Sequence, residues 1–212
     1  MDGIRAVLFD FGGVFTPSPF AALDGLSAEL GAAPGELMQI VFGPYDRDTD
    51  HPWHRLERGE IPFESAREEI RALGVQRGIE ADPLQIFARM DGGAGAREGL
   101  VERTRALRQR GFGTALVTNN AREFRDTWTE LIPVEELFQV VIDSSEVGLR
   151  KPNPEIFQLA LRRLGDLEPR EALFLDDFPA NVEAAKRLGI RGVLVETEPV
   201  EALRILDRLL AG

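Results

Sequence analysis

Acidic, hydroxyl and basic side chains follow short apolar runs at four places in the chain. Asp10 follows the first run and Thr118 the second. Asp176 and Asp177 follow the fourth run, and Lys151 lies in the loop beyond the third. If the runs are strands of one parallel sheet, their carboxyl ends meet at one edge, where such sheets bind ligands. These five side chains are therefore expected to share one crevice.

Three carboxylates in one crevice repel one another, and a cation relieves that repulsion. Oxygen donors without cysteine or histidine favour a hard cation, Mg²⁺ before Ca²⁺. The Lys151 ammonium and the Thr118 hydroxyl suit a phosphate. Gly12 and Gly13 allow close backbone approach, and their N–H groups can face an anion. The residues thus predict metal-assisted chemistry on a phosphate or a similar anion.

The elements that must position these residues alternate between strand and helix. Strands are predicted at 4–9, 113–117, 139–142, 172–175 and 191–195. Runs that are apolar throughout are typical of strands covered on both faces. Helical patterns lie between or after them, at 99–110, 154–164, 181–188 and 200–210. The alternation predicts an α/β fold, an open parallel Rossmann-like sheet covered by helices.

One long segment after the first strand interrupts this alternation with helical patterns and no strand. Its helices are predicted at 21–30, 34–41, 63–73 and 82–89. The stretch 44–62 is polar, aromatic and rich in turn residues, and the glycine-rich stretch 91–95 is a flexible return. We expect an α/β core of residues 1–16 and 92–212 and an all-helical cap of residues 17–91. The cap could be a lid or simple packing decoration.

Composition narrows the classes of function. The 212 residues include 25 basic and 36 acidic side chains, with a net charge of −11. This balance argues against sequence-independent nucleic-acid binding and against docking on an anionic membrane. The absence of cysteine excludes disulfides and thiolate catalysis, and His51 and His54 are the only histidines. With no signal peptide or membrane span in the sequence, we expect a cytoplasmic monomer or homodimer that acts on a small molecule.

The four loops resemble the four motifs of the haloacid dehalogenase-like hydrolase superfamily in their order and strand-end placement. The segments that carry the resemblance are VLFDFGGV (7–14), LVTNN (116–120), KPNP (151–154) and FLDDFPAN (174–181). It covers the whole chain, and residues 17–91 fall where this family has a helical cap. The resemblance implies a Mg²⁺-dependent hydrolase of a small phosphorylated metabolite, similar to the members that act on sugar phosphates.

The resemblance also implies roles for the acidic residues. Asp10 would be the nucleophile that forms an aspartyl-phosphate, and its other oxygen would bind Mg²⁺ together with the backbone carbonyl of Gly12. Asp177 is the first choice for the direct metal ligand. Asp176 would be an alternative ligand or would hold metal-bound water, and Asn181 would orient this acidic loop.

The remaining implied roles concern the substrate. Thr118 would hydrogen-bond the transferring phosphoryl group, with the backbone N–H of Asn119 beside it. Gly12 and Gly13 would let the backbone contact the substrate. Lys151 would neutralise the charge of the nucleophile and the phosphate.

At Gly12 the sequence departs from the family pattern. Phosphatases of this family usually carry a second aspartate there, which acts as general acid and base and is worth about 10²–10⁴-fold in rate. Two alternatives follow: a metal-independent 2-haloacid dehalogenase, which does not use that aspartate, and a non-catalytic homologue that binds its ligand. Dehalogenases tend to have neutral residues in place of Asp176 and Asp177, so the acidic pair favours the metal-dependent reaction.

Other readings of the same residues are less consistent with the pattern. A receiver-type signalling domain has its acidic pair after the first strand, and a dinucleotide-binding domain needs G-x-G-x-x-G there.

The stretch 45–55 mixes aromatic, imidazole and arginine side chains, which could recognise a sugar or a second anionic group. Packing of Trp53 in the cap core explains the same stretch equally well. His54 is a candidate for the missing acid or base, because its reference pKa is near neutral.

Overall fold

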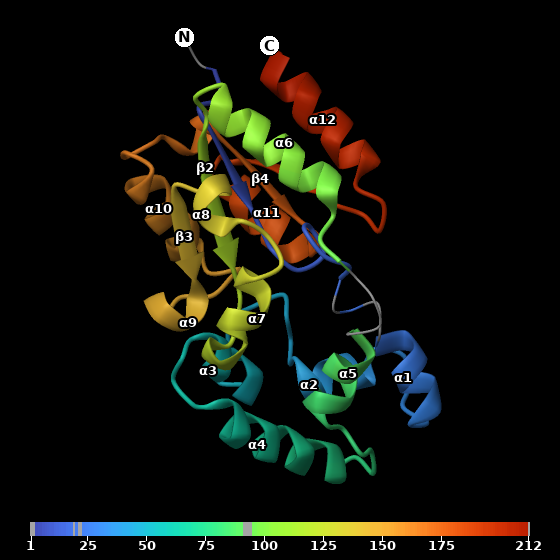
Figure 1. Ribbon diagram of the computed structural model, residues 1–212. Helices are drawn as coiled ribbons and strands as arrows, with labels where there is room; N and C mark the ends of the chain where they lie inside the picture. Colours follow the sequence, from blue (N-terminus) through green and yellow to red (C-terminus); the bar gives the residue numbers. More distant parts are fainter. Residues whose placement is uncertain (1–2, 19, 21–22, 91–94, 212) are drawn as a thin grey trace.

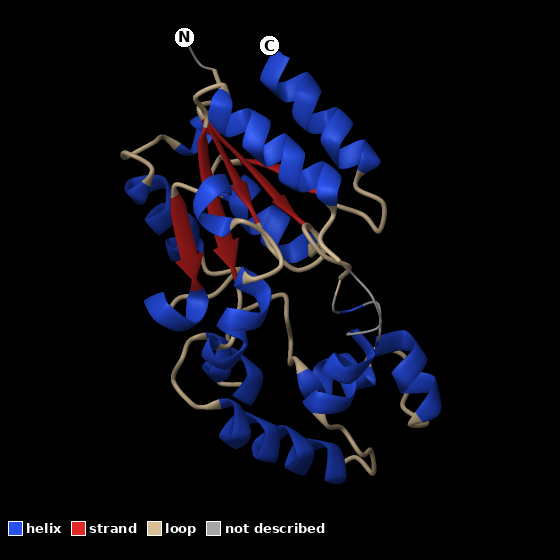
Figure 2. Cartoon of the chain, in the orientation of Figure 1, coloured by secondary structure: helices blue, strands red, loops and turns tan. Residues whose placement is uncertain are grey.

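Five parallel strands form a single sheet in the order β3-β2-β1-β4-β5, drawn as red arrows in Figure 2. The strands are β1 (Ala6–Phe9), β2 (Gly113–Thr118), β3 (Val140–Asp143), β4 (Ala172–Asp176) and β5 (Arg191–Leu194). This computed structural model describes residues 3–18, 20, 23–90 and 95–211. All five predicted strands are confirmed to within two residues at each end. The strands β1, β2 and β4 are buried almost throughout, as expected of apolar runs in a parallel sheet, whereas the edge strand β5 is exposed at both ends.

Helices cover both faces of the sheet, as Figure 1 shows. The alternation of side chains along β1 sends Val7 and Phe9 to one face and Leu8 to the other. Helices α6 (Glu98–Gln109) and α12 (Val200–Ala211) pack on the first face. Helices α10 (Pro154–Arg163) and α11 (Pro179–Arg187) pack on the second. The predicted α/β Rossmann-like fold is confirmed.

Five short helical turns that the sequence analysis did not predict lie in the loops of the core. They are η2 (Arg122–Phe124), α7 (Arg125–Thr129), α8 (Val134–Leu137), α9 (Ser144–Val147) and η3 (Pro169–Glu171). Elements of three to five residues are too short to show a hydrophobic period. Within the described residues, no helix has both the length and the apolar character needed to cross a membrane.

Five helices between β1 and α6 lie beyond the carboxyl ends of the strands, at the opposite end from both termini (Figure 1). They are α1 (Leu23–Glu29), α2 (Glu36–Val41), α3 (Pro52–Glu57), α4 (Phe63–Val75) and α5 (Pro83–Met90). We call this segment, residues 23–90, the helical insertion. Most of its buried side chains, among them Leu37, Ile40 and Ile70, form one hydrophobic cluster, which Ala121 of the core joins. The predicted flexible return at 91–95 falls outside the described residues, except for Gly95.

Helix α3 corrects the sequence analysis, which assigned no helix to residues 44–62. Pro52 occupies the first turn, where its missing N–H costs nothing. The His51 ring accepts a hydrogen bond from the backbone N–H of Trp53 at 3.2 Å, which caps the helix. Trp53 and Leu56 are buried in the insertion. Burial of this face against α4 stabilises a helix too short to show a period in the sequence.

Because the side chains of β1 are fully buried, a cavity created there should lower the free energy of unfolding markedly. Leu8 is fully buried, so Leu8→Ala should lower the free energy of unfolding by about 2–5 kcal/mol. The matched control is Val75→Ala, at a side chain that is 75% exposed, where a change within about 0.5 kcal/mol is expected. Urea denaturation measures both. Equal losses in the two variants would contradict the burial assigned to β1.

Candidate active site

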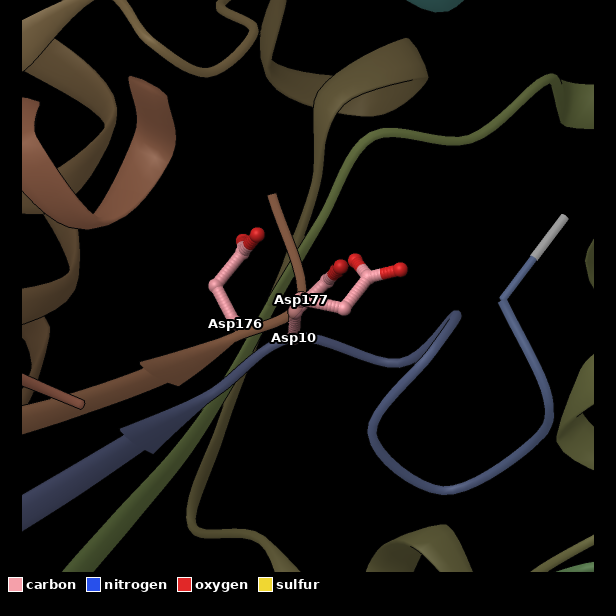
Figure 3. A group of neighbouring side chains, drawn as sticks. All are labelled: Asp10, Asp176 and Asp177. Atoms are coloured by element: carbon pink, nitrogen blue, oxygen red, sulfur yellow. The ribbon is translucent and has the colours of Figure 1, made fainter. Parts of the chain in front are cut away.

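Three aspartates meet at the carboxyl ends of the two central strands. Asp10 directly follows β1, Asp176 ends β4 and Asp177 follows it. The register pairs Phe9 with Leu175, and the Asp10 N–H donates to the Leu175 carbonyl at 2.8 Å. One oxygen from each of the three carboxylates lies within 4.8 Å of the others, and Figure 3 shows the side chains emerging together from the strand ends. The parallel register thus brings together groups that are about 166 residues apart in the sequence.

Lys151 lies among these carboxylates. Its Nζ is 2.6 Å from Oδ1 of Asp10 and 2.7 Å from Oδ2 of Asp176. The side chain is only 1% exposed. Burial alone would lower the pKa of Lys151, but the Asp10 and Asp176 carboxylates raise it above its usual range. The ammonium therefore stays charged and offsets part of the negative charge of the site.

The loop that carries Lys151 is held by the end of β2. The Asn119 side chain accepts a hydrogen bond from the backbone N–H of Lys151 at 2.7 Å and donates to its carbonyl at 3.0 Å. Thr118, the last residue of β2, is 4% exposed. Its hydroxyl has one weak hydrogen bond, at 3.5 Å to the Asn119 carbonyl. That hydroxyl is therefore the group in this loop that can most readily turn to an incoming ligand.

The two adjacent aspartates have different surroundings. Asp176 is fully buried, and its carboxylate accepts hydrogen bonds from the Phe178 N–H at 2.7 Å and from Asn181 Nδ2 at 3.1 Å to each oxygen. Together with Lys151, these donors occupy both of its oxygens. Asp177 is partly exposed, and the Ser18 side chain interacts with its carboxylate. Asp177 thus has more free acceptor capacity than Asp176.

Gly13 lies directly against the Asp177 carboxylate. Its φ is +74°, in the left-handed region that favours glycine. A Cβ at this position would lie 2.1 Å from Cγ and Oδ2 of Asp177. Both the backbone conformation and the lack of space therefore require glycine here, and the glycine lets Asp177 approach the loop after β1.

Arg97 and Ser18 are site residues that sequence reasoning missed. The Arg97 guanidinium donates to the carbonyl of Gly13 at 2.7 Å and to that of Thr197 at 2.8 Å. It thereby ties the loop after β1 to the segment after β5. Arg97 is 84 residues from Gly13, and no local pattern marks a contact at that separation.

Burial and mutual repulsion raise the pKa values of Asp10 and Asp177. Burial is the main cause that raises the pKa of Asp10 to about 8; Lys151 opposes the shift, while Asp176 and Asp177 add to it. Burial, followed by the neighbouring Asp176, raises the pKa of Asp177 to about 6. A bound cation would favour the ionised forms of both groups. The donor set, all oxygen, fits a hard divalent cation.

Aromatic rings pack where the acidic loop meets the helical insertion and the segment before it. The ring of Phe178, next to Asp177, has its centroid 5.0 Å from that of Tyr45 and 5.4 Å from that of Phe20. Trp53 and His54 are buried within the insertion. Trp53 therefore packs in the interior, which was one of the two open readings of the stretch 45–55.

His54 does not fit the role of a general acid. Burial, with the nearby Arg150 charge, lowers the pKa of His54 to about 3. Its Nδ1 accepts a hydrogen bond from the backbone N–H of Thr49 at 3.1 Å. The imidazole is therefore neutral at physiological pH and has no proton to donate from that nitrogen.

The chain is similar to curated proteins of several kinds. It is 33% identical to acyl-CoA dehydrogenase family member 10 of Mus musculus over 210 residues, which are 97% of this chain and 19% of that protein. It is 33% identical to validoxylamine A 7'-phosphate phosphatase of Streptomyces hygroscopicus subsp. limoneus over 114 residues, 53% of each chain. The chain thus spans about one fifth of the first relative and about half of the second.

Solved structures with the same fold include a HAD family enzyme from Bacteroides thetaiotaomicron in complex with magnesium and inorganic phosphate. Its TM-score is 0.63 at 22% identity, with 92% of this chain and 96% of that chain covered. The L-2-haloacid dehalogenase of Xanthobacter autotrophicus, with chloropropionic acid covalently bound, has a TM-score of 0.59 at 21% identity and covers 99% and 83%. At these identities the likeness concerns the fold alone.

The family itself follows from the sequence of the whole core. A sequence model of the haloacid dehalogenase-like hydrolases matches residues 4–189, from the first strand to the end of the helix after the acidic pair. Its span includes all four loops that meet at the strand ends. This chain therefore belongs to the haloacid dehalogenase-like hydrolases.

Proposed function

We propose that this hydrolase is a Mg²⁺-dependent phosphomonoesterase that acts on a small phosphorylated metabolite through an aspartyl-phosphate on Asp10. One observation carries the proposal: the Asp10 carboxylate shares a buried crevice with the Lys151 ammonium and with two further carboxylates. A nucleophile, a cation for the phosphate and ligands for a metal then lie together. The phosphatases among the curated relatives support the same class of substrate.

The residues of the crevice fit Mg²⁺. Asp10 and Asp177 would hold the ion with the backbone carbonyl of Gly12, since both carboxylates have raised pKa values that a cation would relieve. Asp176 has its oxygens engaged by Lys151, Asn181 and the Phe178 N–H, so we assign it the supporting role. When bound, the ion supplies positive charge that offsets the phosphate and the nucleophile.

The chain's own residues divide the remaining work. One Asp10 oxygen attacks phosphorus and forms the aspartyl-phosphate. The bond from phosphorus to the ester oxygen breaks, and that oxygen leaves as the oxygen of the alcohol product. Thr118 and the Asn119 N–H hydrogen-bond the phosphoryl oxygens, and Lys151 offsets their charge. Water then hydrolyses the aspartyl-phosphate and regenerates Asp10. Gly12 offers no side chain as an acid, so the leaving oxygen takes its proton from water or from the substrate itself.

We further propose that residues 17–91 are a cap and that residues 1–16 and 92–212 are the catalytic core. The hydrophobic cluster formed mainly by the helical insertion, with few residues from the core, supports this division. The rings of Phe20 and Tyr45 lie against Phe178, next to the acidic loop. The cap would therefore form an apolar side of the substrate pocket and help exclude water.

A metal-independent 2-haloacid dehalogenase is the second candidate. Gly12 favours it, because that reaction does not use a second acid, and dehalogenases are among the structures with this fold. The exposed acceptor capacity of Asp177 argues for the metal-dependent reaction. Chloride release from a 2-haloacid in EDTA, without phosphate release in Mg²⁺, would select the dehalogenase.

A phosphate-release screen tests the proposed activity. Small phosphorylated metabolites are incubated with wild type and with Asp10→Asn, each in Mg²⁺ and in EDTA. We expect release that requires Mg²⁺ and that falls by about 10³-fold or more in Asp10→Asn, since the covalent route is lost. Undiminished release in Asp10→Asn would overturn the nucleophile, and release in EDTA would overturn the metal requirement.

Gly13→Ala should weaken Mg²⁺ binding, because the added Cβ collides with the Asp177 carboxylate. Isothermal titration calorimetry should show affinity reduced by about tenfold or more, or about 1.4 kcal/mol. The matched control is Gly111→Ala, where φ is +87° and nothing lies within 4 Å of the new Cβ. It suffers the same kind of backbone strain away from the site. Equal Mg²⁺ affinity in the two variants would argue against Asp177 as a ligand.

The raised pKa of Asp10 predicts a pH-dependent stability in EDTA. Because its pKa moves from 3.8 to about 8 on folding, the folded chain binds more protons than the unfolded chain between these values. Stability from the protonated group is fully present below about pH 4 and is lost as the pH rises through about 8. Thermal unfolding should therefore show a Tm that falls across this interval less steeply in Asp10→Asn than in wild type. The control is Asp46→Asn, at an exposed carboxylate, whose curve of Tm against pH should run parallel to that of wild type. A parallel curve for Asp10→Asn as well would contradict the raised pKa of Asp10.

A further inference from the structure

A buried ion pair joins the helical insertion to the residue that precedes Lys151. Arg150 has a fully buried side chain, and its Nε donates to Oε2 of Glu57, in α3, at 2.7 Å. Glu57 is 2% exposed. The contact spans 93 residues of sequence. Neither residue has a place in the chemistry proposed above, although both are charged and buried beside it.

The partners of the pair fix its geometry. The other Glu57 oxygen accepts hydrogen bonds from the Tyr45 hydroxyl and from Trp53 Nε1, both at 2.9 Å. The Arg150 guanidinium lies over the Tyr45 ring, with 4.9 Å from Cζ to the centroid, and NH1 donates to the Arg47 carbonyl at 3.3 Å. A buried ion pair is seldom a net source of stability compared with apolar residues of similar size. Its consequence here is a defined position for the groups it holds.

Two residues, Arg150 and Asn119, constrain the backbone of Lys151. Arg150 is its chain neighbour, and Asn119 holds its backbone N–H and carbonyl. The Tyr45 hydroxyl, which donates to Glu57, also interacts with the Asn119 side chain. The insertion thus reaches the lysine loop by two routes. The ammonium of the Lys151 side chain must stay within hydrogen-bonding distance of Asp10 and Asp176 to offset their charge.

We infer that Glu57 and Arg150 are positioning residues that set the location of the Lys151 ammonium from the helical insertion. The inference rests on the proposed function for the role of Lys151 in turnover, but the placement of the ammonium is a property of the fold. If so, the Lys151 ammonium is correctly placed only when α3 is correctly packed against the core. A displacement of about 1 Å in such a group can reduce the rate by about 10²-fold.

The chain offers a direct probe, because Lys151 and Lys186 are its only lysines. In protein labelled with ¹⁵N and ¹³C at lysine, NMR spectra contain one buried and one exposed side-chain ammonium. The Lys186 side chain is 47% exposed, on α11, and serves as the internal reference. Spectra recorded in EDTA report on the placement of Lys151 whether or not the protein has phosphatase activity.

The test variant replaces both charges together, Glu57→Gln with Arg150→Met, so that no buried charge is left unpaired. Its matched control is Arg67→Met with Asp82→Asn, which removes the ion pair between α4 and Asp82 at 2.8 Å within the insertion. The control pair does not touch the Lys151 loop. Glu57→Asp is a second variant: it keeps a carboxylate opposite Arg150 and adds no lysine, but its side chain is one methylene shorter and cannot keep the present contacts with Arg150, Tyr45 and Trp53.

We expect the test variant to shift or broaden the Lys151 signals and leave those of Lys186 unchanged. With p-nitrophenyl phosphate and Mg²⁺, kcat should fall by about 10²-fold in the test variant while KM changes much less. The kcat of Glu57→Asp should lie between those of the test variant and wild type. The control should match wild type in both measurements.

Unchanged Lys151 signals in the folded test variant would overturn the inference, even if kcat falls, and so would equal effects in the control. If the test variant does not fold, an unchanged Lys151 spectrum in Glu57→Asp would overturn it in the same way. Absence of phosphate release from wild type would overturn the proposed function instead, and the Lys151 spectra would still decide this inference.

Discussion

The contact of the Lys151 ammonium with the carboxylates of Asp10 and Asp176 is the interaction on which the site depends. Like charges this close and this deeply buried cannot all ionise unless a cation lies among them. Lys151 is fully enclosed and within 2.7 Å of both carboxylates. The parallel register of β1 and β4 and the Asn119 hydrogen bonds to the lysine backbone hold these charges in place. The sheet thus acts mainly as the frame for one small cluster of charges.

The environment, and not the residue type, gives the two adjacent aspartates different capacities. Asp176 is surrounded by donors from the lysine, from Asn181 and from the start of α11. Asp177 lies against the backbone of Gly13, where no side chain fits. A carboxylate whose oxygens are already satisfied orients its neighbours, whereas one with free acceptor capacity can bind an added cation. The division of roles between these neighbours follows from their local hydrogen bonds.

The helical insertion contacts the core through polar as well as apolar groups. Phe178 packs on Tyr45, and the backbone N–H of Phe63 donates to Glu123 at 2.8 Å. Gly59 lies against the carbonyl of Ser145, where a Cβ would be 2.3 Å away. Directional contacts of this kind specify one orientation of the insertion more narrowly than apolar packing alone. The position of α3 and the geometry of the site are therefore linked through the same interface.

The sequence by itself determined the sheet and the set of loops that meet at its edge. Strands buried on both faces must be apolar throughout, so their runs are visible, and the loops at their carboxyl ends share an edge by topology. Tertiary structure alone decided which partner each polar group has. Helix α3 was missed because its six residues are stabilised by burial against α4. The contacts of Arg97 with Gly13 and of Arg150 with Glu57 join residues 84 and 93 positions apart. Nothing local marks such pairs, because the free energy that selects them arises only when distant segments are packed together.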